Sequence, residues 1–382
     1  MRRIFCIFLA LVPLLTLSAR AAEPSGEAGF DLGCSGAVLM ERETGTVLFA
    51  KGEHQRLSPA SVTKVMTLLL IAEAVDGGAL SPEETVTASA RAASMGGSQI
   101  WLKEGERMSA AEMTKCIAVV SANDCAVAMA EHLCGSEEAF TARMNQRAEE
   151  LGLEDTHFTN CTGLFEDPNH YTSAYDVAVM SRELLGHDFV RQFTTLWTDT
   201  IRDGAFGLTN TNRLVRYYPG CTGLKTGFTS TAMFCLSASA MRDDTEYIAV
   251  ILHDETSQRR FDDARTLLDY AFANYTLITP RTDSLPRVQV RLGTEDSVGV
   301  VCGESGRILV EKRLRSALEA AAELPAQIPA PVEAGQRLGT LILSADGRVV
   351  ARVPLLAEDS VEKLGMFRIW QGLVRTMCGQ RD

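Results

Sequence analysis

A chain of 382 residues is long enough to bury one large hydrophobic core and a second, smaller one. Its composition, 46% hydrophobic and 23% charged, is that of a folded protein and excludes a disordered or multi-span membrane chain. The formal net charge of −12 argues against a nucleic-acid surface, because binding to phosphates needs a basic face. We therefore expect no nucleic-acid partner.

The first 21 residues differ from the rest of the chain. Two arginines near the start are followed by an apolar stretch at residues 4–17 and by small residues at positions 19 and 21, the pattern of a secretory signal. The alternative is a retained membrane anchor, but the apolar stretch is shorter than the roughly 20 residues that span a membrane. The sequence favours a cleaved signal peptide over residues 1–21, and hence an exported protein.

The cysteines and histidines do not form a recognisable metal site. Ten cysteines are spread along the chain without C-x-x-C or similar spacing, and the six histidines contain no H-E-x-x-H motif. Removal of Cys6 with the signal leaves an odd number, so we do not expect a disulfide framework, although one or two pairs are compatible with export. We predict no metal and no cofactor.

Residues 22–278 predict one α+β domain. Hydrophobic periodicity indicates the following elements in chain order: strands at 36–40 and 46–50, a helix from Pro59 through Ser61 to about Val75, helical runs over 109–151, a helix at 175–185, strands at 233–240 and 247–252, and a helix at 260–275. Strands at both ends with helices between them predict a mixed sheet covered by helices.

A second, smaller unit follows a linker at residues 277–286, which carries two prolines in a polar run. Short strand-like segments separated by Gly and Asp turns predict a small all-β domain over 285–356. They lie at 288–291, 298–301, 308–312, 338–343 and 349–353. Residues 314–324 have high helix propensity and do not fit this pattern.

Residues 358–378 predict an amphipathic helix. Its apolar face carries Phe367 and Trp370, and the opposite face carries Arg368 and Arg375. This arrangement favours a helix that lies in a membrane interface. A helix packed on the β domain and a short coiled-coil stripe are the alternatives. The terminal position and the cationic face in an acidic protein favour the membrane.

Three short motifs carry the chemistry. The first is Ser61-Val62-Thr63-Lys64, S-x-x-K near the start of a buried helix. Residues three apart on a helix share a face, so the Lys64 amine is predicted to reach the Ser61 hydroxyl and to take its proton. The motif is weak alone, and a second match at residues 360–363 has no supporting context.

The other two motifs are Ser121-Ala122-Asn123, in a break between helical runs, and Lys225-Thr226-Gly227, before a predicted strand. The combination S-x-x-K, S-x-N and K-T-G in this order is far more specific than any one of the three. It resembles the signature of penicillin-binding proteins and serine β-lactamases.

The surrounding sequence is similar to that of low-molecular-mass D-alanyl-D-alanine carboxypeptidases. The resemblance covers residues 36–275 closely, and the layout of 285–378 is similar to that family's C-terminal β domain and membrane-binding helix. It implies an antiparallel sheet with helices on both faces and a helical subdomain. The similar segments are 56–61, 130–132, 156–160, 162–164, 170–176, 210–212 and 223–229.

The resemblance implies that the enzyme removes the terminal D-alanine from peptidoglycan stem peptides and binds β-lactams covalently. Ser61 would attack the carbonyl with Lys64 as the base, and Ser121 would pass the proton to the leaving amine. Asn123 would hold the substrate amide. The other substrate-binding residues that the resemblance implies are Lys225, Thr226, Gly227, Phe228 and Arg260.

Each of these five has its own implied role. Lys225 and Thr226 would bind the terminal carboxylate, and Gly227 would let the strand approach substrate. The backbone N–H groups of Ser61 and Phe228 would form the oxyanion hole. Arg260 matches the family's arginine near the carboxylate; Arg259 is the competing assignment, and either arginine is also explained as a solvated helix-end charge.

The sequence departs from the family pattern at Cys161, where proline is usual, and at Cys125, where a small apolar residue is usual. A reactive thiol at Cys125 is one interpretation, and the sequence favours a packed helix residue. Two other functions are considered. A β-lactamase needs a glutamate that activates water, and Glu166 follows a carboxypeptidase-type segment instead. A non-catalytic wall sensor is disfavoured because all three motifs are intact.

Overall fold

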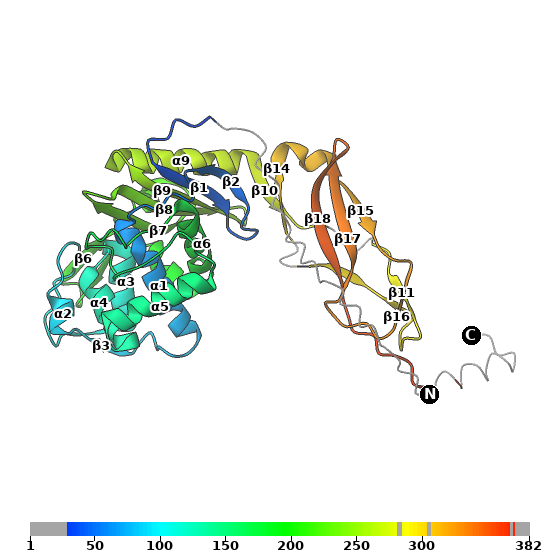
Figure 1. Ribbon diagram of the computed structural model, residues 1–382, viewed down its shortest axis with the longest axis horizontal. Helices are drawn as coiled ribbons and strands as arrows, with labels where there is room; N and C mark the ends of the chain where they lie inside the picture. Colours follow the sequence, from blue (N-terminus) through cyan, green and yellow to red (C-terminus); the bar gives the residue numbers. More distant parts are fainter. Residues whose placement is uncertain (1–28, 281–284, 304–306, 367–369, 371–382) are drawn as a thin grey trace, which may run out of the picture.

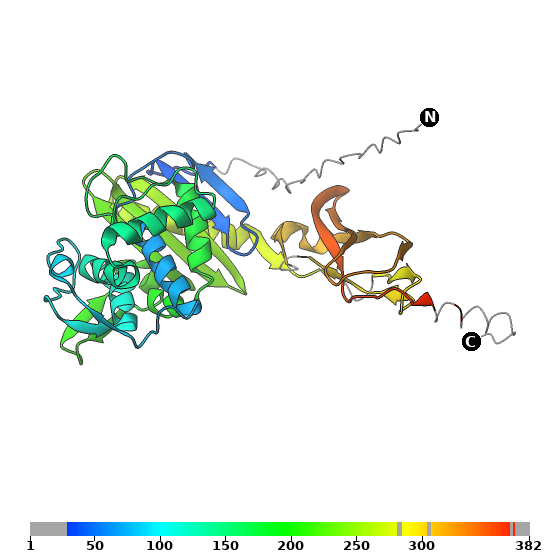
Figure 2. The same cartoon turned by 60° about the horizontal axis from the view of Figure 1, so that its bottom comes forward.

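The computed structural model describes residues 29–280, 285–303, 307–366 and 370. The predicted signal peptide, residues 1–21, lies outside the described part. The described chain forms a large α+β domain and a smaller β-rich domain, which are connected through strand β10 (Tyr275–Ile278) (Figures 1 and 2).

A five-stranded sheet forms the centre of the large domain, and its strand order is β2-β1-β9-β8-β7. Every neighbouring pair is antiparallel. The predicted strands near 36, 46, 233 and 247 are all present. The bounds are β1 (Gly36–Glu41), β2 (Val47–Lys51), β7 (Cys221–Thr229), β8 (Met233–Arg242) and β9 (Thr245–Asp254).

Helices cover both faces of this sheet, as expected (Figure 1). α9 (Ser257–Asn274) packs on one face, and α6 (Ala174–Leu184) packs on the other beside α1 (Lys64–Asp76). All residues of α1 from Lys64 to Ala72 are buried. The absence of a polar face on this helix follows from its central position, because neighbours surround it on all sides.

A helical subdomain packs around α1. Its main helices are α3 (Ala110–Val120), α4 (Asn123–Cys134) and α5 (Glu137–Glu150), which confirms the predicted helical runs over 109–151. Side-chain oxygens of Ser109 and Ser136 accept backbone N–H groups at the starts of α3 and α5. The remaining elements are β3 (Thr85–Thr87), α2 (Ala90–Ala93) and β4 (Arg107–Ser109).

Two local predictions near the motifs need correction. The α-helix predicted from Pro59 begins only at Lys64, and Ser61 lies in the preceding 3-10 turn η1 (Ala60–Thr63). Lys225-Thr226-Gly227 does not precede a strand but lies in the middle of β7. Elements that sequence periodicity did not indicate are α7 (Asp188–Thr194), β5 (Thr198–Ile201), β6 (Phe206–Thr209) and α8 (Leu214–Tyr217).

The C-terminal domain is β-rich, as predicted, and its first strand pairing bridges the two domains. β10 pairs with β14 (Ile308–Glu311) in an antiparallel ladder. A four-stranded sheet has the order β13 (Val300–Cys302), β18 (Arg348–Ala357), β17 (Arg337–Ala345) and β15 (Glu319–Glu323). A three-stranded sheet has the order β12 (Ser297–Val298), β11 (Val288–Arg291) and β16 (Gln327–Pro329).

Pairing with distant segments explains why two predicted helices in this domain differ from the structure. Residues 314–324 are not an α-helix: the 3-10 turn η2 (Lys312–Ala317) precedes β15, whose pairing with β17 overrides helix propensity. The tail helix does not start at residue 358, because Val361 forms a bridge with Val332 and is 2% exposed in the β-domain core. Residues 358–365 are not helical, Met366 and Trp370 are helical, and residues 367–369 and 371–378 of the predicted helix lie outside the described residues.

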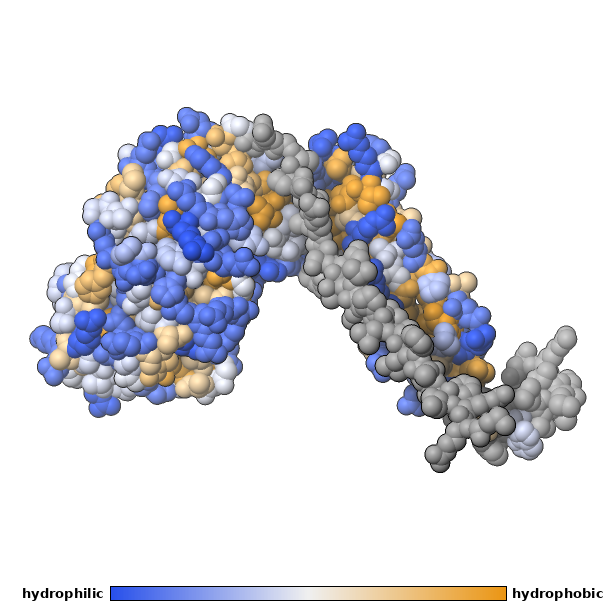
Figure 3. Space-filling model, in the orientation of Figure 1, coloured by the Kyte–Doolittle hydropathy of each residue, from blue (hydrophilic) through white to orange (hydrophobic). Residues whose placement is uncertain are grey.

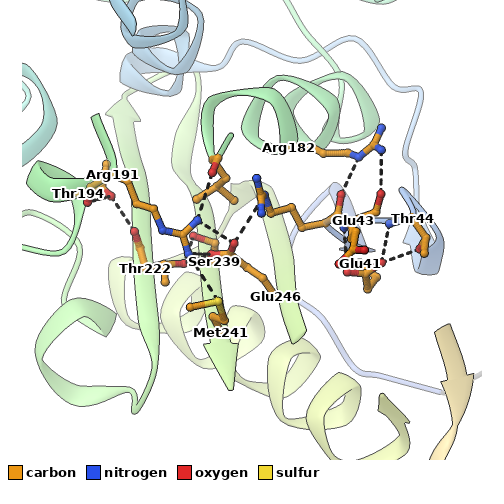
Figure 4. Close-up of polar contacts among 12 residues, drawn as sticks. Glu41, Glu43, Thr44, Arg182, Arg191, Thr194, Thr222, Ser239, Met241 and Glu246 are labelled. Carbon is orange, nitrogen blue, oxygen red and sulfur yellow. Dashed lines mark hydrogen bonds and ion pairs between the residues drawn. The ribbon is translucent and has the colours of Figure 1, made fainter. Parts of the chain in front are cut away.

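A buried charge cluster stabilises one end of the central sheet (Figure 4). The Glu246 side chain, 3% exposed, accepts hydrogen bonds of 3.0 Å from both terminal nitrogens of Arg191. Thr222 Oγ1 donates to the same carboxylate over 2.5 Å, and Arg42 Nε lies 3.7 Å away. The cluster joins α7, β7 and β9.

The surface of the two domains differs in the view of Figure 3: hydrophobic residues are prominent on the C-terminal domain, whereas the visible face of the large domain is mostly hydrophilic. Exposed hydrophobic residues of the C-terminal domain include Leu292, Val349 and Met366. All eight cysteines in the described part are free. No helix within the described ranges is long and apolar enough to cross a membrane.

Candidate active site

The structure brings Ser61 and Lys64 together. Ser61 lies in η1, and Lys64 begins α1 one turn later, so the two side chains share a face. Lys64 Nζ donates to Ser61 Oγ over 3.0 Å and to the carbonyl of Thr162 over 2.8 Å.

Burial prepares the Lys64 amine to act as a base. The side chain is fully buried, and this loss of hydration lowers its pKa from 10.5 to about 7. The nearby Cys161 and Asp124 counteract this lowering only in part. A large fraction of the amine is therefore neutral near pH 7, and a neutral amine hydrogen-bonded to a serine hydroxyl can remove its proton.

The carbonyl that binds Lys64 is held by a turn that sequence reasoning gave no role. Asn160 Oδ1 accepts from the Thr162 and Gly163 N–H groups at 3.1 and 2.7 Å. Gly163 has φ +70°, and a Cβ there would lie 1.9 Å from the carbonyl oxygen of Ala60. Only glycine fits this contact. The Asn-x-Thr-Gly spacing indicates a turn, but its position beside Lys64 is a tertiary property.

Ser121 forms the turn between α3 and α4 and has a left-handed backbone, φ 64° and ψ 31°. Its N–H caps α3 by donating to the carbonyl of Cys116. The side chain is 3% exposed, and Oγ has no hydrogen-bond partner among the residues that the structure describes. An unpaired buried hydroxyl is costly, and a strained backbone often marks a functional position.

Asn123 also has an unpaired acceptor. Its Nδ2 donates to the carbonyl of Gly96 over 2.8 Å, and its N–H donates to the carbonyl of Ser98 over 2.7 Å. Oδ1 is buried without a partner in the described part of the chain. The amide is therefore fixed in place with its oxygen available, so it can accept an N–H from a peptide.

Strand β7 supplies the third motif. Lys225 is 1% exposed, and its Nζ donates to the Thr226 carbonyl over 3.0 Å. Thr226 Oγ1 donates to Thr211 Oγ1 over 2.7 Å. A Cβ on Gly227 would lie 2.7 Å from the Pro59 carbonyl oxygen and 3.1 Å from the Ser61 nitrogen. The absence of a side chain at Gly227 thus allows the turn that carries Ser61 to pack against β7, a role that the sequence did not indicate.

The structure distinguishes the two candidate arginines. Arg260 is buried, and its Nη1 donates to the carbonyls of Gly227 and Cys235 at 2.8 and 3.2 Å, whereas Arg259 pairs with Glu255 at the surface. Arg260 therefore supports β7 directly. Phe228 is 57% exposed and stacks on Phe234 with ring centroids 4.5 Å apart.

The site is electropositive although the protein is acidic. Burial lowers the pKa of Lys225 well below 10.5, and the nearby Lys64 and Arg260 lower it further. Burial also lowers the pKa of Arg260 to about 10. Positively charged groups that lower one another's pKa in this way favour an anionic ligand, because its negative charge reduces the repulsion between them.

The structure shows the surroundings of Glu166 and Cys125, the two residues for which the sequence left an alternative role. Glu166 is not directed at Ser61: its Oε1 accepts from Ser230 Oγ at 3.0 Å and from the Thr231 N–H at 3.3 Å. Cys125 is fully buried in α4, and burial raises its thiol pKa well above 9.0. A buried protonated thiol is unreactive, which favours the packing role.

Comparisons with known proteins agree with this geometry. Residues 20–256 match the family model described as D-alanyl-D-alanine carboxypeptidase. Residues 275–363 match the model of the penicillin-binding protein 5 C-terminal domain. Together they span both domains of the structure.

Similar proteins cover nearly the whole chain. D-alanyl-D-alanine carboxypeptidase DacF of Bacillus subtilis is 42% identical over 99% of this chain and 98% of its own length. Penicillin binding protein 5 from Haemophilus influenzae has a TM-score of 0.79 and 28% identity, covering 88% of this chain and all of that chain. Penicillin binding protein 6B from Escherichia coli has a TM-score of 0.73 and 30% identity over 87% of this chain and 98% of that chain.

The intact motifs, the buried serine–lysine pair beside the K-T-G strand and both family matches lead to one conclusion. The chain belongs to the D-alanyl-D-alanine carboxypeptidase family and is a serine-type, penicillin-binding D-Ala-D-Ala carboxypeptidase of the cell wall.

Proposed function

We propose that Ser61 is the nucleophile of this carboxypeptidase and that Lys64 is its base. The contact of 3.0 Å between Lys64 Nζ and Ser61 Oγ carries this proposal, because the amine is fully buried and its pKa is about 7. Neutral Lys64 takes the serine proton as Oγ attacks the carbonyl between the two D-alanines. The terminal D-alanine leaves, and water then hydrolyses the acyl-enzyme.

The remaining residues are assigned by the polar and charged groups that they carry. Ser121 passes the proton to the leaving amine, since its hydroxyl is buried and unpaired in the described structure. Asn123 accepts a substrate N–H through Oδ1. Lys225, Thr226 and Arg260 provide positive charge and a hydroxyl for the terminal carboxylate.

The proposed oxyanion hole consists of the N–H groups of Ser61 and Phe228. The close approach of Gly227 to the Ser61 nitrogen supports it, because the peptide that follows Gly227 carries the Phe228 N–H. Backbone donors fixed between a strand and a turn need no reorganisation as charge develops, and one such donor contributes about 3–4 kcal/mol.

Covalent labelling tests the nucleophile. The wild-type protein should bind a fluorescent penicillin covalently, and Ser61→Ala should not, because only the hydroxyl forms the acyl bond. Ser360→Ala, in the second S-x-x-K match, is the matched control and should label like wild type. Labelling of Ser61→Ala would remove Ser61 from the mechanism.

Mass spectrometry of a muropeptide separates an enzyme from a wall sensor. Incubation of the wild-type protein with a pentapeptide muropeptide should remove one alanine, whereas Ser61→Ala should leave the pentapeptide intact. Penicillin labelling without repeated loss of alanine would instead support a sensor that acylates once.

We also propose that the protein is exported and acts at the outer face of the cytoplasmic membrane. In this proposal residues 1–21 are the signal, 22–278 the catalytic domain and 285–356 the β domain. The membrane helix begins at Met366, and the exposure of Met366 and Trp370, 88% and 60%, supports a membrane-facing tail. The substrates are peptidoglycan stem peptides, and β-lactams are covalent inhibitors.

A further inference from the structure

A buried histidine that has no role in the reaction described above contacts the turn that carries Ser61. His170 is 3% exposed and lies a few residues before α6. Its Nε2 is 2.7 Å from the hydroxyl of Thr63, the third residue of the S-x-x-K motif. The motif therefore makes a buried polar contact through a residue other than its serine and its lysine.

The hydrogen bonds of the imidazole determine which nitrogen carries the proton. Nδ1 of His170 lies 3.1 Å from the backbone nitrogen of Thr159 and accepts its N–H, so Nδ1 carries no proton. The proton is therefore on Nε2, which donates to Thr63 Oγ1. Burial lowers the pKa of His170 to about 4, so the ring keeps this neutral form at the pH values at which Lys64 titrates.

The Thr63 hydroxyl connects the histidine to the backbone beside the nucleophile. Because this hydroxyl accepts from His170, its own proton is free to donate, and Oγ1 lies 2.7 Å from the carbonyl oxygen of Ala60. Ala60 has φ 47°, a left-handed conformation that is strained for a residue with a Cβ. Such a conformation persists only where neighbouring groups hold it, and the Thr63 hydrogen bond is one of these restraints.

The Ala60 carbonyl and the Ser61 N–H belong to the same peptide unit. This peptide is trans, so its C=O and N–H point in opposite directions within one plane. A hydrogen bond that fixes the carbonyl therefore also fixes the direction of the N–H, which is one of the two proposed oxyanion donors. The backbone of β7 packs against the same peptide, since a Cβ on Gly227 would lie 3.1 Å from the Ser61 nitrogen.

We propose that His170 is a positioning residue for the oxyanion hole, and that it orients the Ser61 N–H through Thr63 and the Ala60 carbonyl. It does not act as an acid or a base, because both ring nitrogens are already hydrogen-bonded within the protein. The inference rests on the acyl-enzyme mechanism of the preceding section and adds to it a residue that does not touch the substrate.

A positioning role and a purely structural role predict different kinetics. The oxyanion hole acts on the transition state, so a misdirected N–H lowers the rate of acylation and leaves binding of the ligand nearly unchanged. Loss of a purely structural contact lowers the free energy of unfolding and leaves the acylation rate of the folded protein as it was.

Stopped-flow acylation by a fluorescent penicillin tests the role. A series of penicillin concentrations separates the dissociation constant of the first complex from the acylation rate constant. His170→Phe keeps an aromatic ring without its hydrogen bonds, and Thr63→Val keeps nearly the same shape without the hydroxyl. Each should lower the acylation rate constant at least about tenfold and change the dissociation constant by less than about threefold. The pH midpoint near 7 should not move, because the base is Lys64.

A double variant and a conservative variant make the test specific. His170→Phe/Thr63→Val should acylate about as slowly as the slower single variant, because both changes break one chain of hydrogen bonds. His170→Gln offers an amide N–H and an amide oxygen, and should keep at least about a third of the wild-type rate. The matched control is His157→Phe, an exposed histidine of the same segment, which should acylate like wild type. Urea unfolding shows that each variant is folded in the assay.

Two results would overturn the inference: wild-type acylation rate constants in the folded single variants, or losses that multiply in the double variant. If His170→Phe does not fold, Thr63→Val and Thr63→Ser decide the question, because only serine keeps the hydroxyl. Slow acylation by the valine variant alone would support the role, and equal rates would refute it. Labelling of Ser61→Ala would refute the proposed nucleophile instead, so the two failures are distinguishable.

Discussion

The Lys64 amine shows how burial of a single residue creates the reactive group. An exposed lysine is almost wholly protonated at neutral pH and cannot accept a proton. Full burial in α1 removes hydration from the charged form, and the Thr162 carbonyl and the Ser61 hydroxyl fix the direction of the amine. Burial thus gives Lys64, the proposed base, a lowered pKa beside Ser61, the proposed nucleophile.

The first prediction concerns pH. Protonated Lys64 cannot take the serine proton, so the rate of penicillin acylation should rise about tenfold per pH unit below pH 7 and level off above it, with an apparent pKa near 7. Stopped-flow measurement of acylation with a fluorescent penicillin gives this profile. A rate independent of pH from about 5.5 to 8.5 would show that Lys64 is not the base.

The residues around the site were predictable to different degrees. Ser61, Lys64, Ser121, Asn123 and Lys225 stand out in the sequence because the motifs are short and ordered. Thr162 and Asn160 contribute a carbonyl and a turn, and nothing in their side chains points to Lys64. A backbone role of this kind depends on where the chain returns in space.

At the scale of elements, the site depends on close contact between β7 and η1. The strand passes so near the Ser61 turn that position 227 has room only for hydrogen. The same contact places the Ser61 and Phe228 peptides side by side. The K-T-G strand therefore packs directly against the turn that carries Ser61.

Gly227→Ala tests this contact. The new Cβ would lie 2.7 Å from the Pro59 carbonyl oxygen, so the turn must shift and Ser61 with it. We expect kcat/KM to fall at least about tenfold and the free energy of unfolding to fall by about 1–3 kcal/mol. Steady-state kinetics and urea unfolding measure the two effects. Wild-type values for both would contradict the close packing.

The charge cluster at Glu246 joins elements distant from the reaction (Figure 4). Glu246→Ala should lower the free energy of unfolding by about 3–5 kcal/mol, because Arg191 and Thr222 lose their buried acceptor. The control is Glu150→Ala, whose carboxylate is exposed beside Arg143 and Arg147 and should change stability by less than about 1 kcal/mol. Equal effects in urea unfolding would contradict the structural role of the cluster.

At the scale of the whole molecule, the β domain is joined to the catalytic domain by more than a linker. β10 pairs with β14, and Arg307 Nη1 binds Glu43 Oε2 over 2.9 Å while Nη2 donates to the Asp244 carbonyl over 3.0 Å. These contacts connect the domains by backbone pairing and by charge. The catalytic groups lie entirely within the first domain.

Removal of the tail tests membrane association. A chain truncated before Met366 should leave membranes in a sedimentation assay and cleave a soluble pentapeptide at nearly the wild-type rate. The cut should not be placed at Ser360, because Val361 belongs to the β-domain core and its loss would destabilise that domain. Unchanged sedimentation with membranes would refute the tail as the anchor.

The sequence by itself determined the chemistry and most of the regular elements. The three motifs indicate the family and predict the nucleophile, the base and the strand that binds the carboxylate, because those functions need particular side chains. Long periodic segments such as α3, α5 and α9 were predictable since one face of each is buried. The order of the two domains followed from the change in pattern after residue 277.

Only the tertiary structure decided features that depend on contacts between distant segments. Residues 319–323 became a strand through pairing with β17, and Val361 left the predicted helix for the β-domain core. His170 contacts Thr63 although 107 positions separate the two residues in the chain. Local sequence sets propensity and chemistry, whereas burial and long-range pairing, which contribute more free energy, select the final conformation and the neighbours of each group.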